Sequence, residues 1–222
     1  MAEIDHSDWA SRWSEGRIGF HQESVSDFLA EYAERAWGPA PIGRVLVPLC
    51  GKTLDMVFLA ERGAEVIGIE YVEQALTEFF AEHDLVPEIE REPAIRYRAG
   101  DYTLFASDFF EVSVDQVGVI DAVFDRAALV ALDPETRVRY AAHLRTLMPA
   151  GAPILLITFD YDQAEMNGPP FAVPDDEVRR LFADGFAVEH LQTREIVVEQ
   201  FLRDRGLSAM SESAYVITRS GS

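Results

Sequence analysis

The sequence predicts an α/β fold with a mainly parallel sheet. Strand-like and helix-like segments alternate along most of the chain, which is the order that βαβ units produce. The strand-like segments are short apolar runs bounded by turn residues, as expected for strands buried on both faces. Two late strand-like segments, 186–198 and 214–218, follow each other without a long helix between them. They favour an antiparallel edge to the sheet.

The first elements can be assigned from their residue patterns. Residues 7–15 and 24–36 are expected to form helices ahead of the sheet, and the apolar run 44–48 a buried first strand. In the helix expected at 53–62, apolar residues recur at helical spacing, and Gly63 is a typical stop. The remaining elements are strands at 66–69, 95–99, 119–124 and 153–159 and helices at 72–80, 134–147 (with Pro134 at its first position) and 175–182.

Length and composition indicate one globular domain. Of the 222 residues, 48% are hydrophobic and 26% are charged, and no linker divides the chain. We therefore expect a single domain over 1–222, with a helical extension at 1–40 and an α/β core at 41–220. No run of 18 apolar residues occurs, so no spanning helix is expected. The acidic start is unlike a secretory signal, and the single cysteine, Cys50, excludes an internal disulfide. Both features predict a cytoplasmic protein, and the scattered histidines suggest no metal site.

The charge of the chain limits its partners. Asp and Glu number 39 against 19 Lys and Arg, which gives a net charge of −20. Nucleic acids and anionic membranes are therefore not expected as partners. No long exposed apolar stripe can be identified, so a monomer is the default expectation. The only lysine is Lys52, which lies in the most informative motif of the chain; it either binds an anion of a ligand or caps a loop.

That motif is the stretch 45–55, in which a strand enters a tight loop and a helix leaves it. Ligands of open α/β sheets bind at the carboxyl ends of the strands, close to this first turn. Glu70 ends the next strand, 21 residues after Leu49. A carboxylate at that point is placed to accept both hydroxyl groups of a ribose. The two features together indicate a ligand that carries adenosine.

The loop is not built for phosphates. Gly51-Lys52-Thr53 is like the end of a phosphate-binding P-loop, but Leu46 stands where that loop needs its first glycine. A dinucleotide fingerprint needs three spaced glycines, of which only Gly51 is present. An adenosine cofactor without phosphate, S-adenosylmethionine, fits best. A nicotinamide-dependent oxidoreductase and a non-catalytic adenosine-binding protein are the alternatives in other classes.

The same stretch, Pro-Leu-Cys-Gly-Lys at 48–52 followed by Asp55, resembles the thiopurine S-methyltransferases. Three more segments match that family in order, at 13–22, 100–102 and 124–131, and the similarity runs from about Trp9 to Thr218. The related halide and thiol methyltransferases have a glycine-rich loop in place of 49–52, so this chain follows the thiopurine pattern.

The resemblance implies a fold and an activity. The fold is the Rossmann-like fold of class I methyltransferases: a seven-stranded, mostly parallel sheet with one antiparallel strand, helices on both faces and an N-terminal helical lid. The activity is S-adenosylmethionine-dependent methylation of aromatic or heterocyclic thiols, which leaves S-adenosylhomocysteine. Selenium or tellurium compounds, or another small soft nucleophile, are the alternative acceptors.

The resemblance also implies the site. Glu70 would hold the ribose, and Asp101 and Tyr102 would flank the adenine. Arg126 would reach the methionine carboxylate or position an anionic acceptor, and it is the one candidate catalytic residue. The positions that match cofactor contacts are Trp13, Phe20, Leu49, Glu70, Asp101, Tyr102 and Arg126.

Other reactive residues have more ordinary interpretations. An aromatic lid carrying Trp13 and Phe20 suits a sulfonium cation, but Trp9 and Trp13 also have the spacing of a core anchor. Cys50 is best interpreted as a small buried filler. His21 is either a base or a structural histidine, and no general base is assigned.

Overall fold

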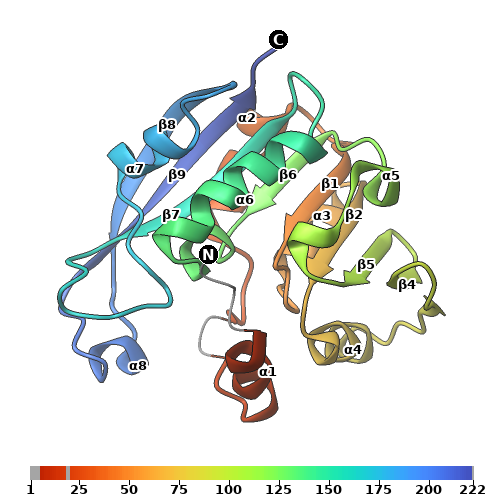
Figure 1. Cartoon of the computed structure of the whole chain (residues 1–222), viewed down its shortest axis with the longest axis horizontal. Coiled ribbons are helices and arrows are strands. Elements are labelled where there is room, and N and C mark those ends of the chain that lie inside the picture. The colour runs from red at the N-terminus through yellow and green to blue at the C-terminus, as the bar shows by residue number, and fades with distance from the viewer. Residues whose placement is uncertain (1–5, 19–20, 222) are drawn as a thin grey trace.

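The computed structural model covers the chain and describes residues 6–18 and 21–221. Within these residues, nine strands form one twisted sheet in the order β3-β4-β5-β2-β1-β6-β7-β9-β8, with helices on both faces (Figure 1). The predicted α/β class is therefore confirmed, with nine strands in place of the expected seven.

Five neighbouring strands are parallel and form the centre of the sheet. Their order in the sheet is β5, β2, β1, β6 and β7. From β1 the chain first adds strands on one side (β2, β5) and then on the other (β6, β7), so the order reverses between β1 and β6. The bounds are β1 (Gly43–Pro48), β2 (Ala64–Glu70), β5 (Tyr102–Ala106), β6 (Ala122–Asp125) and β7 (Pro153–Asp160). On one side the sheet continues through the antiparallel strands β9 (Met210–Arg219) and β8 (Phe186–Ile196).

The opposite edge differs from the sequence prediction. The predicted strand 95–99 is β4 (Ile95–Ala99), but it pairs antiparallel with β5, a strand that the sequence analysis did not identify. Gly100 and Asp101 form the turn of this hairpin, and β5 takes the place beside β2. The short strand β3 (Glu88–Glu90) completes the edge. A two-residue turn allows an antiparallel pair to follow immediately, and this is why 102–106 was missed as a strand.

Alternating side chains of the central strands build two apolar layers. In β1, Val45 and Val47 face one layer, whereas Leu46 faces the other, as the period of two of a strand requires. The first layer is covered by α2 (Asp27–Trp37), α3 (Asp55–Glu61) and α4 (Glu73–Glu82). The second is covered by α5 (Val114–Val117), α6 (Pro134–Leu147) and α7 (Asp175–Leu181).

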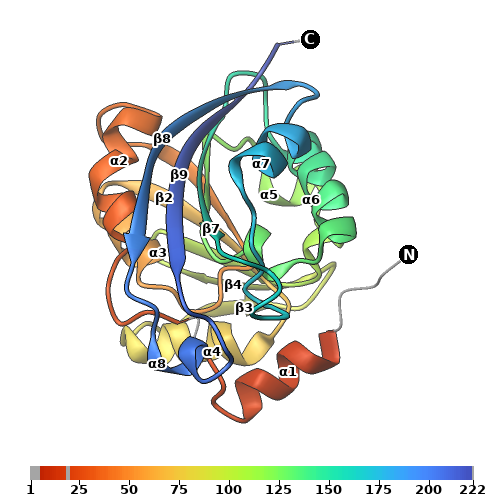
Figure 2. The ribbon, with the colours of Figure 1, turned by 90° about the vertical axis from the view of Figure 1, so that its left-hand side faces the viewer.

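Two helices stand apart from these layers. Figures 1 and 2 show α1 (His6–Ser14) and α8 (Gln200–Arg203) beyond the end of the sheet at which the parallel strands finish. Trp13 anchors α1, because its side chain is 4% exposed and packs against Val72 and Ala75 at the start of α4. Among the described residues, none of the helices combines the length and the apolar content that crossing a bilayer requires.

Candidate active site

A cavity of about 790 Å³ lies at the carboxyl ends of the parallel strands, within the size range of small-molecule sites. The turns after β1, β2, β5 and β6 line one half of it. The end of β7, the loop before α7 and the connection between β8 and β9 line the other half. Helix α1 contributes Trp9, Arg12 and Trp13. The cavity therefore lies where open α/β sheets bind their ligands.

The turn after β1 has an unusual backbone. Leu49 has a φ of 46°, a left-handed conformation that is costly for a residue with a Cβ atom, and Gly51 has a φ of 52°. The turn is tied to β2, because the Cys50 N–H donates to the Ile69 carbonyl at 3.0 Å. A Cβ atom on Gly51 would lie 3.3 Å from Cζ2 of Trp13. The glycine thus lets α1 approach the turn closely.

Cys50 itself is buried against Gly68 of β2. A Cβ atom on Gly68 would lie 2.7 Å from the Cys50 Sγ atom, so the space that the cysteine side chain occupies depends on a glycine at position 68. Burial raises the pKa of the Cys50 thiol well above its ordinary value. A thiol held protonated is a poor nucleophile, which agrees with the interpretation of Cys50 as a filler.

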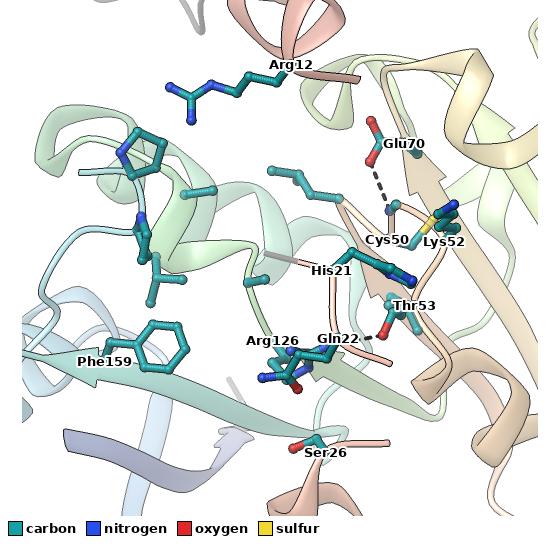
Figure 3. Close-up of a pocket in the computed structure, with 18 of the residues that line it drawn as sticks. Arg12, His21, Gln22, Ser26, Cys50, Lys52, Thr53, Glu70, Arg126 and Phe159 are labelled. Carbon is teal, nitrogen blue, oxygen red and sulfur yellow. Dashed lines mark hydrogen bonds between the residues drawn. The ribbon is translucent and has the colours of Figure 1, made fainter. Parts of the chain in front are cut away.

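Glu70 lies at the end of β2 with its carboxylate in the cavity wall (Figure 3). One oxygen, Oε2, accepts the Gly51 N–H at 3.0 Å, and Oε1 accepts the Val72 N–H at 2.8 Å. Burial raises the pKa of Glu70, although these backbone donors act in the opposite direction. A carboxylate oxygen has more than one lone pair, so each oxygen can accept a further hydrogen bond. This pair of acceptor oxygens fits the two hydroxyl groups of a ribose.

Lys52 points away from the cavity centre toward α4. Its Nζ atom contacts Oε2 of Glu78 at 2.9 Å and Oε1 of Glu82 at 2.6 Å. Burial lowers the pKa of Lys52, but the two carboxylates more than offset this and raise it. The two glutamates lie one helical turn apart, and a compact ammonium group can bridge them. Lys52 therefore holds the turn after β1 onto α4, and it also lines the cavity.

Arg126 follows β6 and is held by a buried carboxylate. Its Nε atom donates to Oδ2 of Asp55 at 2.7 Å, and Nη2 donates to Oγ1 of Thr53 at 3.1 Å. The Arg126 side chain is 6% exposed and Asp55 is fully buried. Arg126 nevertheless lines the cavity (Figure 3). Two of its nitrogen atoms are committed to the protein, so it enters the site in a fixed orientation.

The structure does not bring Asp101 and Tyr102 to this site. They lie at the beginning of β5, beside Val66 at the beginning of β2, which is the opposite end of the sheet from the cavity. Ser107, Asp108 and Phe109, which follow the end of β5, line the cavity. Asp108 accepts the Phe110 N–H at 2.8 Å and begins the 3₁₀ turn η1 (Phe109–Glu111). An aspartate is a typical first residue of a helical turn, and this is the only signal for the segment in the sequence.

Of the other predicted residues, the cavity brings together Trp13, Leu49, Glu70 and Arg126. Phe20 lies outside the described residues. His21 also lines the cavity, and Figure 3 shows its ring beside Lys52 and Thr53. Burial lowers the pKa of His21, and the charges of Lys52 and Arg126 act in the same direction.

The second half of the cavity is mainly apolar. Its wall is made of aromatic, proline and aliphatic side chains that the sequence prediction did not identify. Arg205 supports this wall by donating to the carbonyls of Gly168 at 2.9 Å and Pro169 at 2.8 Å. Within the described residues no group of three His, Cys, Asp or Glu side chains is arranged to hold a metal ion. The wall residues are Phe159, Pro169, Pro170, Ile196, Val197, Phe201, Leu202 and Met210.

The fold is shared with a solved methyltransferase. It matches the 1,6-didemethyltoxoflavin-N1-methyltransferase of Burkholderia thailandensis with a TM-score of 0.65 at 17% identity, over 97% of this chain and 87% of that one. The sheet order, with its cavity at the strand ends, is that of the class I S-adenosylmethionine-dependent methyltransferase fold.

Sequence relatives identify the family. The thiopurine S-methyltransferase family model matches residues 4–220. Thiopurine S-methyltransferases of Pseudomonas aeruginosa (strain UCBPP-PA14) and Azotobacter vinelandii are 45% and 44% identical to this chain. The alignments cover 95% and 96% of this chain and 97% and 99% of those proteins. The chain belongs to the thiopurine S-methyltransferase family.

Proposed function

We propose that this enzyme methylates the sulfur atom of small aromatic or heterocyclic thiols. The observation that carries the proposal is the division of one cavity into two chemically different halves. Polar groups at the strand ends, with Glu70 at their centre, suit the cofactor. The wall that includes Phe159, Pro170 and Phe201 suits a flat apolar acceptor.

The polar half would hold the cofactor through residues of four turns. Glu70 would accept the ribose hydroxyl groups, and Ser107 and Asp108 would flank the adenine in place of Asp101 and Tyr102. The strained turn at Leu49 would lie against the cofactor, and Arg126 would face its charged end. When bound, S-adenosylmethionine supplies an electrophilic methyl group on a sulfonium sulfur.

The chain contributes mainly orientation and exclusion of water. The apolar wall would fix the plane of the acceptor, and holding two reactants in line is worth up to about 7–11 kcal/mol in favourable cases. We propose that α1 acts as a lid, since Trp9 and Trp13 close the cavity on the side beyond the sheet. An aromatic cover also attracts a sulfonium cation. The alternative role of Arg126 would be to position an acceptor whose sulfur carries negative charge.

The test is methyl transfer to thiophenol and to pyridine-2-thione, followed by chromatography of the S-methyl products and of S-adenosylhomocysteine. We expect product from both acceptors with the wild type and a large loss with Glu70→Ala. Phenol and aniline serve as matched acceptors with oxygen or nitrogen in place of sulfur. Methylation of these at equal rates, or of no thiol at all, would refute the proposal.

A further inference from the structure

Glu212 is a cavity carboxylate that none of the roles above uses. It lies on β9, directly between Phe159 of β7 and Arg194 of β8 in the register of the sheet. Its side chain lines the acceptor half of the cavity and is partly buried. Among the described residues, no hydrogen bond or ion pair engages this carboxylate. Glu212 therefore reaches the cavity with its acceptor capacity unused.

Three other ionised groups around the site are engaged within the protein. Asp55 is bonded to Arg126, Lys52 to Glu78 and Glu82, and Glu70 to backbone N–H groups. A carboxylate at an apolar wall is unfavourable unless something donates a hydrogen bond to it. The environment of Glu212 thus indicates a ligand that brings its own N–H or O–H donor.

The charges around Glu212 come from four elements. Burial raises the pKa of Glu212, and Asp27 at the start of α2 and Asp55 of α3 also raise it. Arg126 after β6 and Arg194 on β8 act in the opposite direction, and the net shift is upward. A carboxylate with a raised pKa is a better proton acceptor than an ordinary one, which suits a general base near neutral pH.

We propose that Glu212 is a catalytic residue that binds the ring N–H of a heterocyclic thione and accepts its proton during S-methylation. This rests on the proposed function and narrows its acceptor class. Heterocycles with a nitrogen atom next to the thiol carbon exist largely as thiones, which carry the proton on the ring nitrogen. Methylation at sulfur therefore has to be accompanied by loss of that N–H proton.

The step balances with Glu212 as the base. The thione sulfur forms a bond to the methyl carbon, and the sulfonium C–S bond breaks with its electron pair left on the sulfur of S-adenosylhomocysteine. The N–H bond electrons become the ring C=N bond, and the C=S bond becomes the single bond of a thioether. The proton passes to the Glu212 carboxylate and from there to solvent. No oxidant or metal is required.

A simple arenethiol gives Glu212 nothing to bind. It has no ring N–H, and its reactive form is a thiolate that a carboxylate repels. Glu212 should therefore favour thiones over arenethiols, whereas the apolar wall accommodates both. The comparison of pyridine-2-thione with thiophenol isolates this contribution, because the two rings have nearly the same size.

The experiment measures kcat/KM for both acceptors with wild type, Glu212→Gln and Glu195→Gln. Glu195 is an exposed carboxylate on the neighbouring strand β8 and is the matched control. For Glu212→Gln we expect a loss of about 100-fold with pyridine-2-thione and a change within about threefold with thiophenol. Glu195→Gln should behave as the wild type with both. Calorimetry with S-adenosylhomocysteine should give equal affinities for all three proteins.

The pH profile provides a second readout. With the wild type at saturating S-adenosylmethionine, kcat/KM for the thione should fall as the pH drops through the pKa of Glu212, and this acidic limb should be absent in Glu212→Gln. An equal loss with both acceptors, or no loss with the thione, would overturn the proposal while leaving the proposed function standing. A wild type that methylates neither acceptor would overturn both.

Discussion

Asp55 binds Arg126 through Oδ2 at 2.7 Å, while Oδ1 of the same carboxylate accepts the backbone N–H of Ser26 at 2.8 Å. Ser26 is the N-cap of α2, and its hydroxyl accepts the Leu29 N–H. Thr53 of the turn after β1 also donates to Asp55, at 2.9 Å. The buried Asp55 carboxylate thus connects the beginning of α2, the turn after β1 and Arg126 in the cavity.

Replacing Asp55 by Asn should damage both stability and activity. The substitution leaves the buried Arg126 charge without its partner, and breaking such a pair typically costs about 3–5 kcal/mol. We expect urea unfolding to show a loss of this order and turnover of thiophenol to fall, because Arg126 is no longer held. Glu189→Gln, which removes an exposed ion pair with Arg35, is the control and should leave the unfolding midpoint unchanged. Equal midpoints for Asp55→Asn and the control would contradict the linking role.

Replacing Glu70 by Ala should weaken cofactor binding. Hydrogen bonds to a charged group contribute about 1.5–3 kcal/mol, so we expect the Kd for S-adenosylhomocysteine to rise about 10- to 150-fold in calorimetry. Since burial raises the pKa of Glu70, protonation should weaken wild-type binding as the pH falls through that raised value. Affinity that is independent of pH in the wild type, or unchanged in the variant, would remove the assignment of the ribose contact.

Asp125 should make stability decrease as the pH rises from about 4 to about 6. Burial raises the pKa of Asp125 from 3.8 to about 6, even though Tyr140 donates to it at 2.7 Å. The folded protein then binds a proton that the unfolded chain has released, so the folded state loses about 3 kcal/mol across this range. Asp125→Asn should abolish this contribution. Urea unfolding of both proteins at pH 4.5, 5.5 and 7 measures it, and parallel pH dependences would show that Asp125 does not titrate there.

Replacing Lys52 should loosen the turn after β1 from α4. Lys52→Met leaves Glu78 and Glu82 without their shared cation, and we expect a loss of about 1 kcal/mol, since both glutamates are partly exposed. Lys52→Arg keeps the charge but not the compact shape, so its stability should lie between those of the wild type and Lys52→Met. Thermal unfolding ranks the three proteins. An arginine variant as stable as the wild type would show that charge alone matters.

Much of the fold was accessible from the sequence, because buried parallel strands and their helices leave strong local patterns. Three local signals predicted elements that the structure contains. The apolar run 44–48 predicted β1, Gly63 predicted the end of α3, and Pro134 predicted the beginning of α6. The hairpin of β4 and β5 was missed because its turn, Gly100-Asp101, is short and was interpreted as part of a ligand site.

The site was predictable where a residue follows its strand directly. Glu70 ends β2 and Arg126 follows β6, the two parallel strands on either side of β1, so their position could be inferred from sequence order. Ser107 and Glu212 could not be found in this way. The first depends on identifying β5. The second precedes the predicted strand 214–218, and its place depends on the register of β9 against β7, which no local pattern encodes.

The two halves of the cavity have different architectural origins. The polar half, which would hold the methyl donor, is made from turns of the parallel sheet. An insertion in these turns would disturb the packing of the core. The acceptor wall is carried by two surface connections, 161–174 and 197–209, which extend from the last strands. Surface connections tolerate insertion and replacement far better than the strands that support them. A lineage with this architecture can thus change the compounds it modifies while its methyl source stays the same.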